Sequence, residues 1–320
     1  MKKNNKILFI GDPLSSLKLK TDSSLALAQA AIESNNDVFW CEPQNICYLH
    51  KKLIVQNPSY LVSVNNDKIE QKESLNEEIP FCEFDVAFVR KDPPFDEDYI
   101  TLCWLLSSQQ KVRILNSAES LLNYHEKSLP WRALNEKVLT DKNIIPTCFT
   151  NSISVIDKFC RDFSTTEKFI AKPWLGHGGE DIYLYENKEH LLDDFKKNNR
   201  RHFLVQPFLP NITSEGDRRV IIANGHVVCD YVRLPATGKI ASNGAQGGSA
   251  ILREMTESQK NICEKMAQFL KEKNIYFAGL DLIGEYVGEV NITSPTGIRT
   301  YEALSQKNVS LNIFNLLMEK

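Results

Sequence analysis

Apolar residues in the first third of the chain occur in short runs separated by polar or helical segments. After the first run, Leu25, Ala28 and Ile32 recur at a spacing that places them on one face of a helix. Short apolar runs that alternate with helical patterns predict a parallel sheet with helices packed on it. The stretch 63–80 is polar, and we expect a surface excursion there. The strands predicted in this third are 7–10, 38–40, 86–89 and 112–115.

The pattern changes near residue 124, after which the predicted strands become shorter and hairpin-like. Helical patterns cover 126–140, 190–197 and 256–273. The last of these begins with the capping-box pair Thr256 and Gln259. Asn224-Gly225 between two apolar runs predicts a hairpin. The strands predicted here are 169–172, 182–184, 203–206, 219–222, 226–232, 277–283 and 287–292.

Composition and charge exclude some classes of function. The net charge is -3, so the basic footprint of a nucleic-acid-binding protein is missing. No apolar run approaches the length of a membrane span, and we expect no membrane association. The eight cysteines form no C-x-x-C pair, and the first apolar run is too short for a signal-peptide core. These features predict reduced thiols in a cytoplasmic protein.

A glycine-rich turn follows the predicted strand that ends at Lys172. Gly176, Gly178 and Gly179 allow the backbone N–H groups of this turn to approach phosphate oxygens closely. The lysine before the turn could reach the phosphates of a nucleotide. A flexible hairpin with a solvated lysine explains the same pattern equally well, so the turn alone does not decide between the two interpretations.

Two strands near the C-terminus carry polar residues in otherwise apolar surroundings. Glu289 and Asn291 lie two positions apart, so both point to one face of their strand, and Asp281 on the preceding strand can join them. Hard oxygen ligands suit Mg²⁺ that bridges nucleotide phosphates. Ordinary acids on an exposed sheet face are the alternative, and the apolar surroundings favour the metal.

Other candidate residues lie at strand ends and on a hairpin. Asp12 and the run 90–92 follow two strands of the predicted parallel sheet, where ligands bind in open α/β folds. Gln206 begins a proline-bounded link that could present backbone groups to an adenine, although an interdomain linker is the more ordinary explanation. Arg219 and Arg233 lie on opposite hairpin strands and could converge on a phosphate or carboxylate.

These elements, in this order, resemble the ATP-grasp superfamily, and their details are similar to prokaryotic glutathione synthetases. The resemblance spans nearly the whole chain, and its most specific runs are 90–96 and 291–296. The other matching stretches are 11–16, 123–127, 172–179, 206–210, 216–220, 279–284 and 289–299. The resemblance implies an α/β fold with an N-terminal parallel-sheet, substrate-binding (pre-ATP-grasp) domain at 1–123. A two-part ATP-grasp domain would follow, with a lid subdomain at 124–210 and a catalytic subdomain at 211–320.

The resemblance also implies roles for individual residues, which group by the ligand that each set would contact. ATP would be held by Lys127, Lys172, Gly176, Gly178, Gly179, Gln206 and the backbone of Phe208 and Leu209. Two Mg²⁺ ions, or Mn²⁺, would bind Asp281, Glu289 and Asn291. The catalytic groups near the transferred phosphate would be Arg219, Arg233 and Asn243. Substrate would contact Asp12, Ser15, Arg90, Lys91, Asp92, Ser294 and Thr296.

The implied reaction joins γ-glutamylcysteine to glycine through an acyl phosphate, with ATP as co-substrate and a homo-oligomeric enzyme. One departure bears on the substrate: Ala241 and Ser249 occupy places where the family usually has arginine, and Lys239 or Arg253 are candidate replacements. Two alternatives therefore stay open. One is a sister ATP-grasp ligase with another acidic peptide or amino acid, and the other is a catalytically weak nucleotide-binding regulator.

Overall fold

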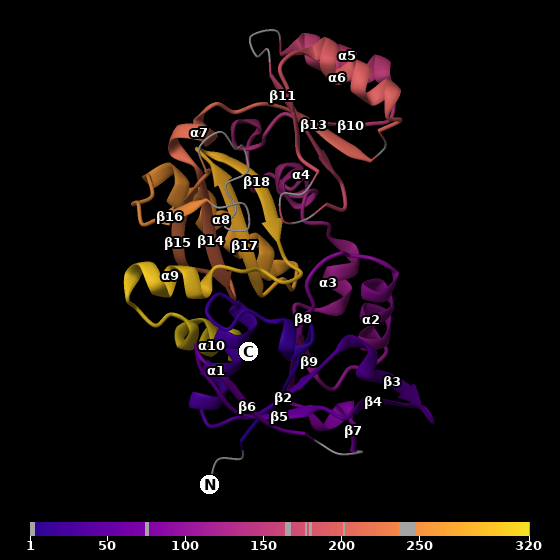
Figure 1. Cartoon of the computed structure of the whole chain (residues 1–320), viewed down its shortest axis with the longest axis vertical. Coiled ribbons are helices and arrows are strands. Elements are labelled where there is room, and N and C mark those ends of the chain that lie inside the picture. Colours follow the sequence, from indigo (N-terminus) through magenta and orange to yellow (C-terminus); the bar gives the residue numbers. More distant parts are fainter. Residues whose placement is uncertain are drawn as a thin grey trace.

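The structure is a computed structural model that describes residues 4–73, 77–163, 168–176, 178, 181–200, 202–236 and 248–319. In these residues the strands form four sheets, and Figure 1 shows three main bodies stacked along the longest axis of the molecule. The N-terminal sheet lies at one end, the sheet formed by 217–291 lies in the middle, and a smaller sheet with two helices lies at the other end.

The N-terminal sheet has six strands in the order β6-β5-β2-β1-β8-β9. Its centre is parallel, as the sequence predicted, because β1 pairs with both β2 and β8, and β8 pairs with β9, all in parallel. Helix α1 begins at an Asp22 cap, and Asp96 caps α2 in the same way. The strands are β1 (Lys6–Gly11), β2 (Asp37–Cys41), β5 (Ser59–Val64), β6 (Ile69–Glu73), β8 (Val86–Arg90) and β9 (Arg113–Leu115), and the helices are α1 (Ser23–Glu33), α2 (Glu97–Ser107) and α3 (Ala118–Asn123).

The prediction of a surface excursion at 63–80 is wrong, because this stretch contributes two strands. Strand β6 continues the N-terminal sheet as its antiparallel edge, and β7 (Glu78–Pro80) joins β3 (Ile46–Leu49) and β4 (Lys52–Gln56) in a small antiparallel sheet. Strand β6 was not predicted because its composition is polar. This composition is typical of an edge strand, where charged side chains face water and discourage pairing with another chain.

The second body is an antiparallel sheet covered by two helices. Its strand order is β10-β13-β11-β12, with Phe169, Leu191 and Phe195 in the core between sheet and helices. The helix predicted at 126–140 is shorter than expected, because α4 covers only seven residues, with Pro130 in its first turn. The bounds are β10 (Cys148–Phe149), β11 (Phe169–Pro173), β12 (Tyr183–Tyr185), β13 (Phe203–Pro207), α4 (Leu129–Asn135), α5 (Ile153–Asp162) and α6 (Lys188–Lys197).

The third body is an antiparallel sheet of five strands in the order β16-β15-β14-β17-β18. The predicted Asn224-Gly225 turn joins β14 to β15, and the predicted Thr256–Gln259 capping box begins α8, which packs on β14 and β15. The bounds are β14 (Asp217–Ala223), β15 (His226–Leu234), β16 (Ser249–Ile251), β17 (Phe277–Ile283), β18 (Tyr286–Asn291), α7 (Asn211–Glu215) and α8 (Glu257–Glu272).

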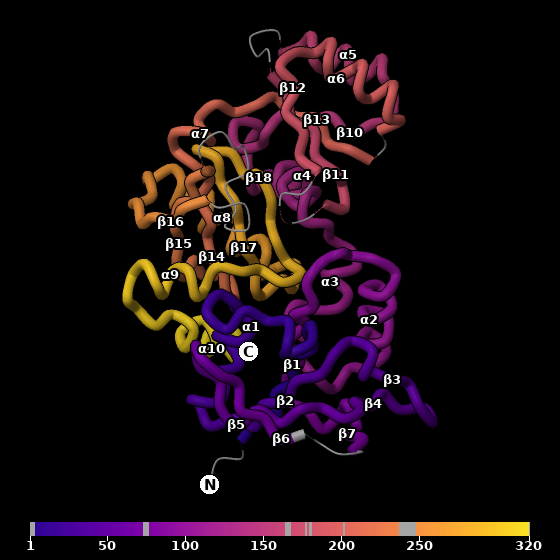
Figure 2. Tube along the Cα trace, viewed as in Figure 1, coloured from indigo at the N-terminus to yellow at the C-terminus, as the bar shows by residue number. Residues whose placement is uncertain are grey.

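The last two helices return the chain to the N-terminal sheet. Helices α9 (Ile298–Ser305) and α10 (Ser310–Met318) pack against α1, and Phe314 stacks on Phe88 of β8. Figure 2 shows this yellow C-terminal segment beside the indigo N-terminal segment. The first and third bodies therefore share one hydrophobic core. Within the described ranges, none of the helices has both the length and the apolar character that a bilayer span requires.

Candidate active site

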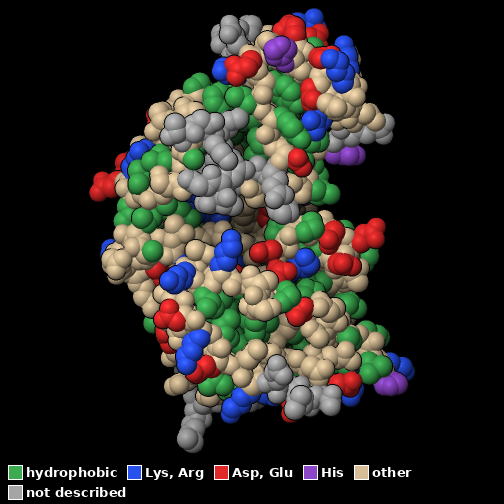
Figure 3. All heavy atoms as spheres, in the orientation of Figure 1, with side chains coloured by type: hydrophobic (Ala, Val, Ile, Leu, Met, Phe, Trp, Pro, Cys, Tyr) green, Lys and Arg blue, Asp and Glu red, His purple; other side chains and the backbone are tan. Residues whose placement is uncertain are grey.

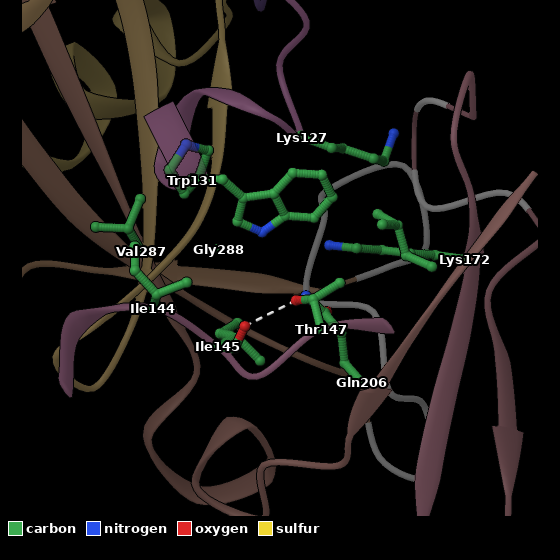
Figure 4. Close-up of a pocket in the computed structure, with 11 residues that line it drawn as sticks. Lys127, Trp131, Ile144, Ile145, Thr147, Lys172, Gln206, Val287 and Gly288 are labelled. Carbon is green, nitrogen blue, oxygen red and sulfur yellow. Dashed lines mark hydrogen bonds between the residues drawn. The ribbon is translucent and has the colours of Figure 1, made fainter. Parts of the chain in front are cut away.

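A pocket lies where the second body meets β18 and the segment around α4. Figure 4 shows Lys127 and Lys172 entering it from different elements, with the Trp131 ring in the middle. The polar lining residues Thr147 and Gln206 are joined by a hydrogen bond of 2.8 Å from Gln206 Nε2 to Thr147 Oγ1. The apolar lining comprises Pro130, Trp131, Ile144, Ile145, Leu204 and Val287. The lining combines apolar walls with two lysines, the kinds of groups that contact a base and its phosphates. The cavity holds only about 10 Å³ here, so a base would enter only when its walls move apart.

A stack of aromatic rings includes Trp131, which lines this pocket. Trp174 stacks on His125 with ring centroids 4.0 Å apart, on Phe149 at 4.8 Å and on Trp131 at 5.8 Å. Burial lowers the pKa of His125 to about 4, and nearby Lys127 adds to the shift. The His125 ring is therefore neutral near pH 7, and its Nδ1 accepts the backbone N–H of Lys127 at 3.2 Å.

The Lys127 ammonium is buried and makes three contacts. It donates to the carbonyls of Trp174 (3.0 Å) and Gly176 (2.7 Å), and it lies 3.2 Å from Glu289 Oε1. Burial lowers the pKa of Lys172, while Glu289 favours its charged form and Lys127 disfavours it. The structure thus brings together the two lysines that the sequence singled out, and it connects one of them to the glycine-rich turn.

The carboxylate of Asp281 lies at the centre of a cluster of ion pairs. Arg219 contacts it at two points, with Nε–Oδ1 at 2.6 Å and Nη2–Oδ2 at 3.1 Å, and Arg233 Nη2 lies 3.0 Å from Oδ2. Arg233 is also paired with Asp217. Burial by itself would raise the pKa of Asp281, but the two guanidinium groups hold it below its ordinary value. The predicted convergence of Arg219 and Arg233 is confirmed, and in this structure they meet on a carboxylate.

Glu289 and Asn291 extend this cluster along β18. Asp281 lies opposite Glu289 in the β17–β18 ladder, so the three side chains share one face as predicted. Asn291 Nδ2 donates to Asp281 Oδ2 and to the Gly279 carbonyl, each at 3.1 Å. Among the described residues, no group of three or more His, Cys, Asp or Glu has the arrangement of a metal site, and the set here combines two carboxylates with an amide.

Arg218 neighbours Arg219 on β14 but contacts different groups. Its guanidinium pairs with Asp230 and donates to the carbonyls of Arg253 and Glu254, which precede α8. Arg253 itself donates to the Glu215 carbonyl at 3.1 Å. Because successive side chains of a strand point to opposite faces, these contacts lie on the side of the sheet away from Asp281. The structure therefore does not bring Arg253 to the Asp281 cluster as a replacement cation.

Some backbone groups at the end of β13 already make hydrogen bonds within the protein. The N–H of Phe208 donates to the Lys168 carbonyl at 2.9 Å, and the Leu209 carbonyl accepts the N–H of Ile212 at 3.1 Å. The groups that a ligand could contact here are consequently the Phe208 carbonyl and the Leu209 N–H. Gln206 is buried, and its bond to Thr147 fixes its side chain at the wall of the pocket.

A second set of predicted residues gathers between the N-terminal sheet and the end of β18. Arg90 is buried, donating from Nε to Ser24 and from Nη2 to the Pro295 carbonyl, each at 2.9 Å. Its Nη1 has no hydrogen-bond partner among the described residues. Ser294 donates to the Arg90 carbonyl at 3.4 Å, and the Thr296 carbonyl accepts from Arg219 Nη1 at 3.0 Å. Arg219 therefore connects the Asp281 cluster to this second set.

The remaining predicted substrate residues are half-buried or exposed. Asp12 Oδ2 accepts the N–H of Asp92 at 2.8 Å, and Lys91 lies over the Tyr99 ring at 5.8 Å. Ser15 is exposed in the short 3₁₀ helix Leu14–Ser16. Figure 3 shows basic and acidic side chains close together on the surface near the middle of the molecule.

Some predicted positions fall outside the described residues: Gly179, Asn243, Ala241 and Lys239. Gly178 is described and has a φ of 61°, a backbone conformation that glycine adopts without strain. Ser249 is described in β16, where it pairs with Leu234.

Sequence reasoning missed Glu126 and the aromatic residues around Trp174. Glu126 Oε1 accepts hydrogen bonds from the backbone at Ile292 and Thr293 and from the Thr293 hydroxyl. A single acid beside a single lysine is an ordinary surface pattern, so only its place in the matching stretch 123–127 could have drawn attention to it. Four aromatic rings from separate segments carry no shared pattern in the sequence.

Comparison with protein families gives two matches that together cover most of the chain. The family model described as "Prokaryotic glutathione synthetase, N-terminal domain" matches residues 6–121. The model described as "Prokaryotic glutathione synthetase, ATP-grasp domain" matches residues 136–306.

Similar full-length proteins carry the same name. A glutathione synthetase of Prochlorococcus marinus is 31% identical over 98% of this chain and 99% of its own length. One from Nitrosomonas europaea is 32% identical over 95% of each chain. Among solved structures, D-cycloserine synthetase DcsG has a TM-score of 0.68 at 14% identity, covering 97% of this chain and 98% of its own. The ATP-grasp ligase PsnB has a TM-score of 0.64 at 13% identity over 99% of both chains. At such low identity these two structures show the shared ATP-grasp fold alone.

Proposed function

The chain belongs to the prokaryotic glutathione synthetase family, and on that premise we propose that the pocket beside β18 binds ATP next to a metal-binding patch formed by Asp281, Glu289 and Asn291. The protein is an ATP-dependent ligase that forms a peptide bond, with ATP as co-substrate. The observation that carries the proposal is the position of Lys127, which reaches both the glycine-rich turn and Glu289 from one buried site.

The adenine would occupy the apolar slot lined by Ile145, Leu204 and Val287. The Phe208 carbonyl would accept from its amino group, and the Leu209 N–H would donate to a ring nitrogen, because the Phe208 N–H already has a partner. Gln206 would line the same wall. The phosphates would take Lys127 and Lys172 as counter-charges, replacing the carbonyl contacts that Lys127 makes here.

The donor set at β17 and β18 fits a hard divalent cation. Two carboxylates and an amide oxygen are the ligands that Mg²⁺ or Mn²⁺ takes beside substrate phosphates. Asn291 donates from Nδ2, which leaves Oδ1 as its metal-binding atom. When bound, the metal would neutralise charge on the β- and γ-phosphates of ATP. Phosphate binding to Lys127 would release Glu289 for this role.

The reaction has two steps, in which the protein orients the reactants. A carboxylate oxygen of γ-glutamylcysteine attacks the γ-phosphorus, the bond to the β-γ bridging oxygen breaks, and ADP leaves. The amine of glycine then attacks the acyl carbon, loses a proton and displaces inorganic phosphate. Arg219 and Arg233 would stabilise the developing negative charge, together with Asn243. The glycine-rich turn, including Gly176, Gly178 and Gly179, would close over the acyl phosphate and exclude water.

The peptide substrate would lie between the Asp281 cluster and the N-terminal sheet. Arg90 Nη1, buried and without a partner among the described residues, is the donor that would receive a substrate carboxylate. Ser294 and Thr296 would line this side, and Asp12, Ser15, Lys91 and Asp92 would form the rim.

The chain would divide into functional units at 1–123, 124–210 and 211–320, with the middle unit acting as the lid. All eight cysteines are free thiols, which agrees with action in the reducing cytoplasm. We further propose a homo-oligomer, on the family resemblance alone.

A coupled assay of ADP release tests the proposal. With ATP, Mg²⁺, γ-glutamylcysteine and glycine the protein should turn over, and omitting any one of the four should abolish continuous ADP release, with at most one ADP per protein formed when glycine alone is omitted. Turnover with another acidic dipeptide but not with γ-glutamylcysteine would reject the substrate while retaining the chemistry. No nucleotide binding at all would reject the ATP site.

A further inference from the structure

Strand β18 is the edge of its sheet, and Glu126 occupies much of its open side. The N–H of Val290 donates to the Glu126 carbonyl at 3.2 Å. Glu126 Oε1 accepts the N–H groups of Ile292 and Thr293 at 2.9 and 3.1 Å, and the Thr293 hydroxyl at 2.9 Å. Glu126 thus accepts four hydrogen bonds from Val290 near the end of β18 and from the two residues that follow the strand, in the place where a neighbouring strand would otherwise pair.

The anchored segment of β18 is the one that carries the predicted metal ligands. Val290 lies between Glu289 and Asn291, so fixing its N–H fixes the backbone of both. On the other side of the contact, Glu126 immediately precedes Lys127, whose ammonium lies 3.2 Å from Glu289. A shift of Glu126 relative to β18 would therefore move the lysine and the acid apart.

We propose that Glu126 is a positioning residue, which holds the phosphate-binding lysine in register with the metal-binding strand. It acts through Lys127, Glu289 and Asn291 and touches no substrate itself. The inference rests on the proposed function, because it assigns Glu126 a role in binding ATP and metal. Residues that orient metal ligands typically affect metal affinity or activity by about 10–100-fold when they are removed.

The chain offers a matched control in Glu302. Its Oε1 accepts the N–H groups of Val309 and Ser310 at 3.1 and 3.0 Å and the Ser310 hydroxyl at 2.5 Å, at the junction of α9 and α10. The Glu302 side chain thus makes the same three kinds of contact as the Glu126 side chain, at a place that the proposed site does not include. Loss of either carboxylate should lower the melting temperature, whereas only the loss of the Glu126 carboxylate should change ligand binding.

The test compares Glu126→Ala, Glu126→Gln, Thr293→Val and Glu302→Ala in the full chain. For each variant, calorimetry gives the Kd of a non-hydrolysable ATP analogue with and without Mg²⁺, and the ADP assay gives kcat and the KM for ATP. Glu126→Ala should raise the KM for ATP and the Kd with Mg²⁺ by about tenfold or more. Glu126→Gln, which keeps the accepting Oε1, should remain close to wild type. Thr293→Val, which removes one of the four bonds, should give a smaller increase.

Two results would overturn the inference. One is Glu126→Ala that melts earlier, like Glu302→Ala, yet keeps the wild-type Kd and KM. The other is Glu126→Gln that is as impaired as Glu126→Ala, since hydrogen-bond acceptance would then not be the cause. If Glu126→Ala fails to fold, the inference is overturned by wild-type Kd and KM values in Thr293→Val, or by a tenfold or greater increase in Glu126→Gln. Failure of the wild-type protein to bind the analogue would instead refute the proposed function.

Discussion

Arg219 and Asp281 lie opposite each other on β14 and β17 and are joined by a two-point ion pair, at 2.6 and 3.1 Å. The pair is buried, and Arg233 closes it from the other side. Asp281 is thereby held ionised and in a fixed orientation beside Glu289. An ionised, fixed carboxylate is what a metal-assisted phosphoryl transfer requires at this position.

Replacing Asp281 should damage both catalysis and stability. Asp281→Asn should lower kcat by about 100-fold or more, because an oriented charge next to the transferred phosphate is lost. It should also lower the free energy of unfolding by about 3 kcal/mol, since the buried Arg219 and the largely buried Arg233 lose the carboxylate that they share. Kinetics and urea unfolding measure the two effects. Asp230→Asn removes the partner of Arg218 on the opposite face, and it should reduce stability while kcat remains near the wild-type value. Equal loss of kcat in both variants would contradict the assignment.

Gly279 should be required for the placement of Arg219. A Cβ at this position would lie 2.9 Å from Arg219 Nη1 and 3.3 Å from the Cβ of Pro295. Because Arg219 is held by both Asp281 and the Thr296 carbonyl, its guanidinium can yield only by breaking a contact. Gly279→Ala should therefore reduce kcat by about tenfold or more.

Gly284 provides the comparison for this variant. It lies in the β17–β18 turn with a φ of 59°, and a Cβ there would meet nothing within 4 Å. Gly284→Ala should cost about 1 kcal/mol of stability through backbone strain, without a change in kcat. Wild-type kcat in Gly279→Ala would show that Arg219 moves freely.

The lowered pKa of Lys172 predicts a pH effect on ATP binding. Burial favours the neutral amine, so the free protein should lose this charge as pH rises through a value below the ordinary 10.4 or so of lysine. ATP affinity should therefore fall with rising pH, and kcat/KM for ATP, which reports the free enzyme, should fall before kcat does. Bound phosphate stabilises the charged ammonium of Lys172 and raises its pKa in the ATP complex. The fall in kcat should therefore occur at higher pH than the fall in kcat/KM.

Lys172→Arg should extend the plateau of kcat/KM to higher pH, because a guanidinium stays charged. The exposed Lys265→Arg on α8 should leave the profile unchanged. An alkaline limb that is identical in wild type and Lys172→Arg would assign the titration to another group.

Nucleotide binding should change tryptophan fluorescence, because Trp131 lines the pocket and stacks with Trp174. Titration with Mg²⁺ and an ATP analogue should give a saturable signal whose midpoint equals the calorimetric Kd. Trp131→Phe should lose most of the signal, whereas Trp104→Phe should retain it, since Trp104 is 64% exposed on α2. A signal that depends on Trp104 would place the ligand elsewhere.

The amino-acid sequence by itself determined the local structure around the site. Period-two alternation placed Glu289 and Asn291 on one face of a strand, and the capping box fixed the start of α8. It also identified Lys172 beside a glycine-rich turn. These features depend only on residues that are close together in the sequence, which is why one sequence is enough to predict them. The edge strand β6 was missed because an exposed edge lacks the apolar pattern on which such predictions depend.

Only the tertiary structure decided which groups meet. Arg90 reaches the carbonyl of Pro295 across 205 positions of sequence, and Glu126 reaches Thr293 across 167. Periodicity assigns a side chain to a face, but the partner on that face depends on how the three bodies pack. Packing is set by many weak apolar contacts acting together, and no single stretch of sequence contains that sum.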